Sequence, residues 1–129
     1  MRLITLILLL VCLNAGATDD KFFRALHQVE TSGRTGAIVG DSGRALGPYQ
    51  IHKAYWIDAD VAGSYSQVTD LEYSKKVVKA YLSRYCPRAV NSHDYETMAR
   101  THNGGRLGPS KTATLKYWHR FKNVLDNSK

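Results

Sequence analysis

The sequence predicts a single α+β domain that is mainly α-helical, with about five helices and a small β-hairpin region. Three observations support this fold class. Apolar residues recur at helical spacing in several segments. This helical pattern is interrupted once, where five glycines lie between positions 33 and 47. A length of 129 residues, without internal repeats or a linker, suits one hydrophobic core.

Residues 1–17 have the features of a secretory signal peptide. Arg2 supplies the positive charge, residues 3–13 are apolar apart from Thr5, and the small residues 15–17 form a cleavage site. Spanning a membrane takes roughly 20 apolar residues, so an uncleaved anchor is the less favoured alternative. We therefore expect cleavage near Ala17 and a secreted domain of residues 18–129.

The first predicted helix covers residues 20–30, because Phe22, Leu26 and Val29 fall on one face. The glycines that follow leave room for only a short strand at residues 37–39, which favours a small hairpin. Four further helices are expected. They cover residues 52–60, residues 70–84 before Pro87, a segment around residues 95–102 that ends at the glycine pair 104–105, and a C-terminal segment from about residue 110.

The chain is basic, with a formal net charge of +7, and its lysines and arginines are scattered. A basic surface favours anionic partners. Without a long basic run, we expect neither a nucleic-acid partner nor stable insertion into a membrane, and we expect a monomer. Cys12 lies in the leader, so Cys86 remains alone and no intramolecular disulfide can form. Either Cys86 is buried, which we favour, or it pairs with another chain.

Glu30 and Asp41 are the candidate catalytic residues. Glu30 ends an amphipathic helix, where partial shielding from water favours a protonated carboxyl group that can act as a general acid. Asp41 lies in a glycine-rich bend, where backbone N–H groups and water can keep a carboxylate ionised. Taken singly, each residue is better explained as a surface or turn residue, and only the residues around them favour the catalytic interpretation.

An aromatic run follows these carboxylates. Tyr49, Tyr55 and Trp56 offer flat apolar faces with polar edges that suit sugar rings, and Gln50 and His52 add hydrogen-bonding groups. Tyr55 and Trp56 could equally belong to the core. The histidines have no zinc-site spacing, the glycines form no phosphate loop, and a GxSxG motif is absent. We expect neither a metal nor a cofactor.

The segments QVETSG, GDSGRALGPYQIHKAYWIDA, ARTHNGG and TLKYW resemble those of the invertebrate-type lysozymes, also called the destabilase family. The similarity runs from Phe22 to Trp118. It implies a lysozyme-like fold and hydrolysis of the β-1,4 bond between N-acetylmuramic acid and N-acetylglucosamine in peptidoglycan. It also implies Glu30 as the acid and Asp41 as the nucleophile or stabiliser of the cation, by analogy with the lysozymes that serve as the general example of this chemistry.

The resemblance further implies a cleft that binds N-acetylhexosamine oligosaccharides. The residues that we expect to contact substrate are Tyr49, Gln50, His52, Lys53, Tyr55, Trp56, Asp58, Tyr85, His102, Asn103 and Gly104. The chain departs from the family in lacking its many disulfides. Two other functions stay open, a lytic transglycosylase that needs only one carboxylate and a non-catalytic cationic wall-binding protein. Ser42 with Lys53 or Lys111 is also a conceivable dyad for isopeptide cleavage.

Overall fold

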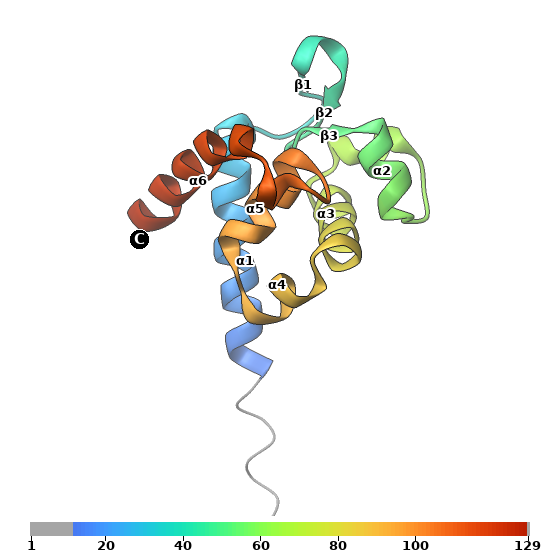
Figure 1. The fold of residues 1–129 in the computed structure, drawn as a ribbon. Coiled ribbons are helices and arrows are strands. Elements are labelled where there is room, and N and C mark those ends of the chain that lie inside the picture. The colour runs from blue at the N-terminus through green and yellow to red at the C-terminus, as the bar shows by residue number, and fades with distance from the viewer. Residues whose placement is uncertain (1–11, 129) are drawn as a thin grey trace, which may run out of the picture.

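The structure, a computed structural model, describes residues 12–128 and consists of packed helices with a small sheet at one end (Figure 1). The helices are α1 (Cys12–Thr31), α2 (Lys53–Ala59), α3 (Leu71–Tyr85), α4 (Pro87–Ser92), α5 (Tyr95–Gly104) and α6 (Leu115–Asn127). The strands are β1 (Val39–Gly40), β2 (Ala45–Leu46) and β3 (Ile51–His52). This architecture confirms the predicted α+β, mainly α-helical class.

The sheet contains one strand more than the predicted hairpin. Its three strands are antiparallel in the order β1-β2-β3, with Val39 opposite Leu46 and Ala45 opposite His52. Each strand has only two residues, because glycines and turns interrupt the segment on both sides. The sheet therefore serves mainly to bring the loop after β1 and the start of α2 together.

The helices differ from the prediction in two places. Pro87 does not only follow α3 but also begins α4, because a proline in the first helical turn sacrifices no intrahelical hydrogen bond. Short 3₁₀ turns at Gly108–Ser110 and Thr112–Thr114 precede α6, which begins at Leu115 and so later than predicted. The helix expected at residues 20–30 is the C-terminal part of α1.

The core fixes α1 against α5 and α6. Phe22 is fully buried, and its ring centroid lies 5.2 Å from that of Phe121 and 5.6 Å from that of Tyr95. Cys86 is a free, buried residue of the same core, which confirms the favoured prediction for its side chain. With α1 held in this way, its last turn faces α6 and the end of α5.

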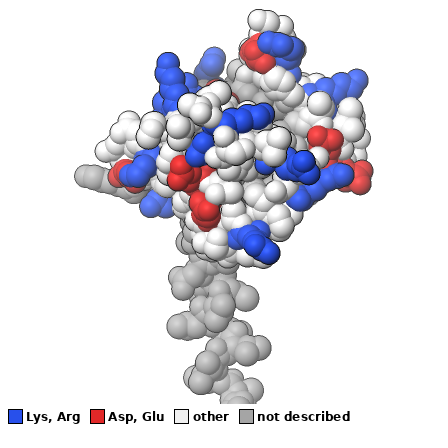
Figure 2. All heavy atoms as spheres, viewed as in Figure 1, with Lys and Arg blue, Asp and Glu red and all other residues white. Residues whose placement is uncertain are grey.

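Three further observations concern the N-terminal segment, the helices and the surface of the molecule. Most of the expected leader lies outside the described residues, so its cleavage near Ala17 stays a prediction. None of the helices within residues 12–128 combines the length and apolar character that a membrane crossing needs. On the face shown in Figure 2, lysine and arginine side chains are spread out among acidic ones.

Candidate active site

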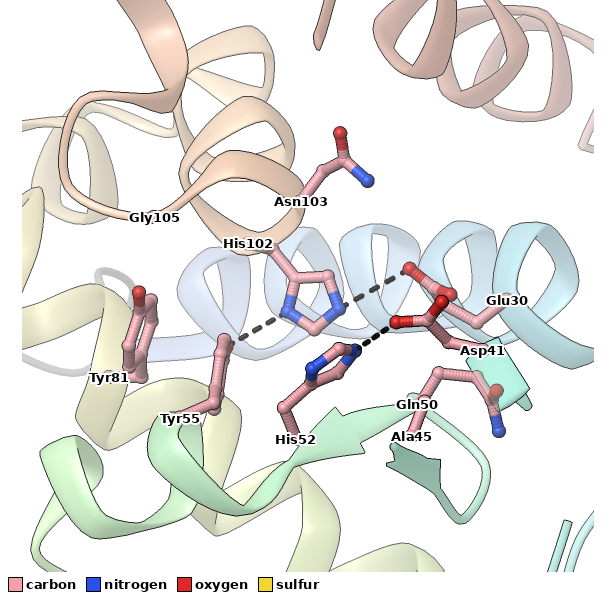
Figure 3. A pocket seen from close by; sticks show the side chains of 10 residues that line it. All are labelled: Glu30, Asp41, Ala45, Gln50, His52, Tyr55, Tyr81, His102, Asn103 and Gly105. Carbon is pink, nitrogen blue, oxygen red and sulfur yellow. Dashed lines mark hydrogen bonds and ion pairs between the residues drawn. The ribbon is translucent and has the colours of Figure 1, made fainter. Parts of the chain in front are cut away.

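Glu30 and Asp41 lie on one cavity of about 400 Å³ between the helices and the sheet. Its walls come from α1, the β1–β2 segment, β3, α2, α3 and α5, as Figure 3 shows. The lining residues are Glu30, Asp41, Ala45, Gln50, His52, Tyr55, Tyr81, His102, Asn103 and Gly105. Polar and aromatic groups dominate this set, as expected for a site that binds a polar ligand with flat faces.

Glu30 is held by groups from distant parts of the chain. Its side chain is 16% exposed, and its Oε1 atom accepts a hydrogen bond of 2.7 Å from the hydroxyl of Tyr117 in α6. The Nε2 atom of His102 lies 3.4 Å from the same oxygen. Burial, and next the charge of Glu30, raise the pKa of Tyr117 well above its usual value, so its hydroxyl stays a donor. Oε1 is thus engaged, which leaves Oε2 as the oxygen available to a ligand.

His102 connects Glu30 to the floor of the pocket. Its Nε2 atom lies 3.2 Å from the main-chain oxygen of Tyr49, and its Nδ1 atom lies 2.8 Å from the hydroxyl of Tyr55. A carbonyl oxygen can only accept, so Nε2 carries a hydrogen. The ring of Tyr55 stacks on Tyr81, with centroids 3.6 Å apart. Burial raises the pKa of Tyr55 well above its usual value. His102 is therefore fixed in orientation by contacts on both ring nitrogens.

Asp41 has different surroundings. It lies in a short 3₁₀ turn after β1 with a φ of 48°, in the left-handed region that aspartate tolerates better than most residues. Its Oδ1 atom lies 3.0 Å from Nη2 of Arg44, and its Oδ2 atom lies 3.1 Å from Nε2 of His52. The side chain is 45% exposed. Asp41 is thus a half-exposed carboxylate between two nitrogen groups, whereas the Glu30 side chain is more shielded from solvent.

Seven of the predicted site residues line the cavity, and six do not. Those that line it are Glu30, Asp41, Gln50, His52, Tyr55, His102 and Asn103. Tyr49 lies in the core at 2% exposure, and only its main-chain oxygen reaches His102. Trp56 donates its indole N–H to the hydroxyl of Tyr73, and Lys53 is exposed outside the cavity. The other three, Asp58, Tyr85 and Gly104, line a neighbouring hollow.

Sequence reasoning missed several residues that shape the site. Tyr117, Arg44, Ala45 and Tyr81 were assigned no role in the site, whereas Gly105 was expected as part of the glycine pair that ends a helix. Arg44 could have been suspected, because it lies three residues after Asp41 in the same tight bend. Tyr117 lies in the TLKYW segment that carries the resemblance, but it is 87 residues from Glu30 in the chain, so the sequence did not predict their contact. Within the described part of the chain, no group of three or more His, Cys, Asp and Glu side chains could hold a metal ion.

Comparison with known proteins places most of the chain in one family. The sequence profile described as Destabilase matches residues 19–124. A lysozyme of Ostrea edulis is 33% identical over 124 residues, which cover 93% of this chain and 90% of the relative. An invertebrate-type lysozyme of Ruditapes philippinarum is 30% identical and covers 84% of this chain and 83% of the relative. The crystal structure of Tapes japonica lysozyme superimposes with a TM-score of 0.70 at 30% identity, covering 84% of this chain and 94% of that one.

Proposed function

The chain belongs to the Destabilase family of invertebrate-type lysozymes, and on this premise we propose that it is a secreted muramidase of bacterial cell walls. It is a glycoside hydrolase of the lysozyme type. The proposed substrate is the β-1,4 bond between N-acetylmuramic acid and N-acetylglucosamine in peptidoglycan, cleaved in defence against bacteria or in their digestion. The observation that supports this most directly is the pair Glu30 and Asp41 on one cavity, in unlike surroundings.

Glu30 is the proposed general acid. Because Tyr117 occupies Oε1, the transferable proton belongs on Oε2, which is free to meet the glycosidic oxygen. Proton transfer to that oxygen lets the bond to the sugar C1 break, and the leaving sugar departs with a hydroxyl group. Tyr117 and His102 restrict the rotation of the carboxyl group, so the proton stays directed at the cavity.

Asp41 is the proposed nucleophile or stabiliser of the positive charge that develops at C1. As a nucleophile, it forms a covalent bond to C1 that water later breaks, with Glu30 taking the proton of that water. As a stabiliser, it faces the oxocarbenium ion without bonding. Its contacts with Arg44 and His52 hold the carboxylate in place in either role. We propose retention of configuration, in line with the family.

The rest of the cavity supplies the sugar contacts. Gln50 has a left-handed φ of 52°, and its side-chain nitrogen donates to the main-chain oxygens of Ile38 and Gly47. This ties the wall near Asp41 together. Asn103 and Tyr55 present hydrogen-bonding groups on the opposite side (Figure 3). We propose that these groups bind the N-acetylhexosamine rings.

The test is digestion of purified peptidoglycan by wild type, Glu30→Gln and Asp41→Asn, with mass spectrometry of the products. Glu72→Gln is a matched control, because its side chain is 76% exposed and lies outside the cavity. We expect both active-site variants to lose at least about 100-fold in rate, the usual scale for removing a general acid, and the control to keep its rate.

The products separate the alternatives. Reducing-end muropeptides that disappear in both variants support a two-carboxylate hydrolase. Anhydro-sugar products that survive Asp41→Asn would identify a lytic transglycosylase instead. Folded wild type that cleaves nothing would leave a wall-binding protein. Secretion is tested separately by N-terminal sequencing of the exported protein, which we expect to begin at Thr18.

A further inference from the structure

A second hollow of about 520 Å³ adjoins the catalytic cavity. Its lining residues are Asp58, Tyr81, Tyr85, Gly104, Gly105, Arg106, Leu107 and Lys111. Tyr81 and Gly105 line both spaces, so the hollow lies directly beside the cavity and meets it at these two residues. In Figure 3 these two residues lie at the end of the cavity opposite Asp41 and Gln50. A long ligand bound at the carboxylates would reach the hollow by passing Tyr81 and Gly105.

The hollow carries more charge than a neutral sugar chain requires. Arg106 and Lys111 bring two cationic groups, and Asp58 brings one carboxylate. All three residues are exposed, so their charges face solvent or a ligand. N-acetylglucosamine carries no ionised group, and in peptide-bearing N-acetylmuramic acid the lactyl carboxylate is converted to an amide, so the sugar rings themselves would not use these charges.

Two of these residues have local structural partners. Lys111 donates from Nζ to the main-chain oxygen of Gly104 at 2.7 Å, which satisfies a carbonyl at the end of α5. The main-chain oxygen of Asp58 accepts from Nη1 of Arg84 at 2.8 Å, which fixes the backbone there but leaves the carboxylate free of that contact. Arg106 forms no ion pair with any described residue. Among the charged groups of the hollow, the guanidinium of Arg106 is therefore the one without a structural role in the fold.

We propose that this hollow binds the stem peptide of peptidoglycan, the short peptide attached to the lactyl group of N-acetylmuramic acid. This inference rests on the proposed function and adds the part of the substrate that the second hollow recognises. A stem peptide carries several carboxylates and an amine, which match two cations and one carboxylate in a single hollow. The rings of Tyr81 and Tyr85 and the 58%-exposed side chain of Leu107 give its apolar parts a surface.

Gly105 leaves space where the hollow meets the cavity. Gly105 caps α5 with a φ of 80°, a conformation that other residues rarely adopt. A side chain there would begin 3.6 Å from the hydroxyl of Tyr81, at the junction of the two spaces. Glycine at this position therefore keeps the passage from the cavity to the hollow open.

The experiment compares two soluble substrates with the same glycan chain, one bare, with its lactyl carboxylates capped as simple amides, and one carrying uncrosslinked stem peptides. The variants are Arg106→Gln and Arg106→Glu, with Arg88→Gln as the matched control, because Arg88 is exposed on α4 and lines neither space. We expect Arg106→Gln to lower the ratio of kcat/KM for peptide-bearing over bare glycan by about 3- to 10-fold, and Arg106→Glu to lower it further. The control should keep the wild-type ratio.

A salt series and a binding measurement complete the test. The wild-type preference for peptide-bearing glycan should shrink as ionic strength rises, since exposed charges are screened. Titration of a free stem peptide, followed by amide NMR shifts, should move residues 104–107 and 111 in wild type and not in Arg106→Glu. An unchanged substrate ratio in both Arg106 variants, or shifts confined to other residues, would overturn the inference. If wild type cleaves neither substrate, the proposed function fails, and the titration still decides whether the hollow binds the peptide.

Discussion

The hydroxyl of Tyr117 in α6 donates to Oε1 of Glu30 at the end of α1, across 2.7 Å. This bond leaves Oε2 for the substrate and limits rotation of the carboxyl group. In Tyr117→Phe we expect kcat on peptidoglycan to fall about 10-fold with little change in KM, because positioning of the acid is lost while substrate contacts remain. The free energy of unfolding should fall by about 1–3 kcal/mol, since a shielded oxygen loses its donor.

Tyr73→Phe is the matched control for this change. The hydroxyl of Tyr73 donates to the main-chain oxygen of Ala62 at 3.0 Å and accepts from Trp56, away from the cavity. Its loss should lower stability without lowering kcat. Equal kcat in wild type and Tyr117→Phe, measured on folded protein, would contradict the positioning role of Tyr117.

The contact between His52 and Asp41 gives a second prediction. Nε2 of His52 lies 3.1 Å from Oδ2 of Asp41, while Arg44 holds the other oxygen. In His52→Ala we expect kcat to fall several-fold, because one of the two groups that orient the carboxylate is lost. His52→Gln should recover much of the rate, since an amide N–H can replace the ring N–H as donor.

The two kinetic constants distinguish this role from the substrate contact that the sequence predicts for His52. A rise in KM in both variants, at constant kcat, would indicate a sugar contact and count against the orienting role. Lys53→Ala is a suitable comparison, because Lys53 is next to His52 in the chain but its side chain is exposed outside the cavity.

The sequence predicted the elements whose pattern is local. Helical spacing identified the helices that carry Glu30, Tyr55 and His102, and the glycine-rich bend identified Asp41. The six-residue helix α4 was missed because it is too short to show periodicity. Tyr49 was expected at the cleft because aromatic rings suit sugars. In a loop, however, the sequence does not indicate which way a ring points, and the ring of Tyr49 is buried in the core.

The tertiary contacts could not be read from the sequence in the same way. The Tyr117–Glu30 bond depends on how α1 packs against α6, and the hollow beyond Tyr81 depends on how α3 meets the end of α5. The resemblance to lysozymes identified residues near the chemistry. It assigned no role to Tyr117 or Arg106, whose surroundings exist only in the folded chain.

Buried tyrosines predict instability in alkali. Burial raises the pKa of Tyr55 and Tyr117 above the usual value of 10.0, so the unfolded chain loses these protons at a lower pH than the folded one. Their contribution to stability is complete below about pH 10 and is lost as the pH rises from there through the folded pKa values. We expect Tm to fall steeply above about pH 10, together with the rise in tyrosinate absorbance. Tyr117→Phe should show a shallower fall, and an identical slope would contradict this account.

The last prediction concerns Cys86, the only cysteine in residues 18–129. Small secreted domains usually contain disulfides, so the state of this single thiol can be tested directly. Its side chain is 9% exposed in the core, and burial raises the pKa of the thiol. Both effects reduce the reactive thiolate, so we expect a thiol reagent to label native protein slowly and denatured protein at once. Reducing agent should change neither Tm nor activity. Rapid labelling of the native protein, or a dimer that reducing agent dissociates, would instead show that Cys86 reaches the surface and pairs with another chain.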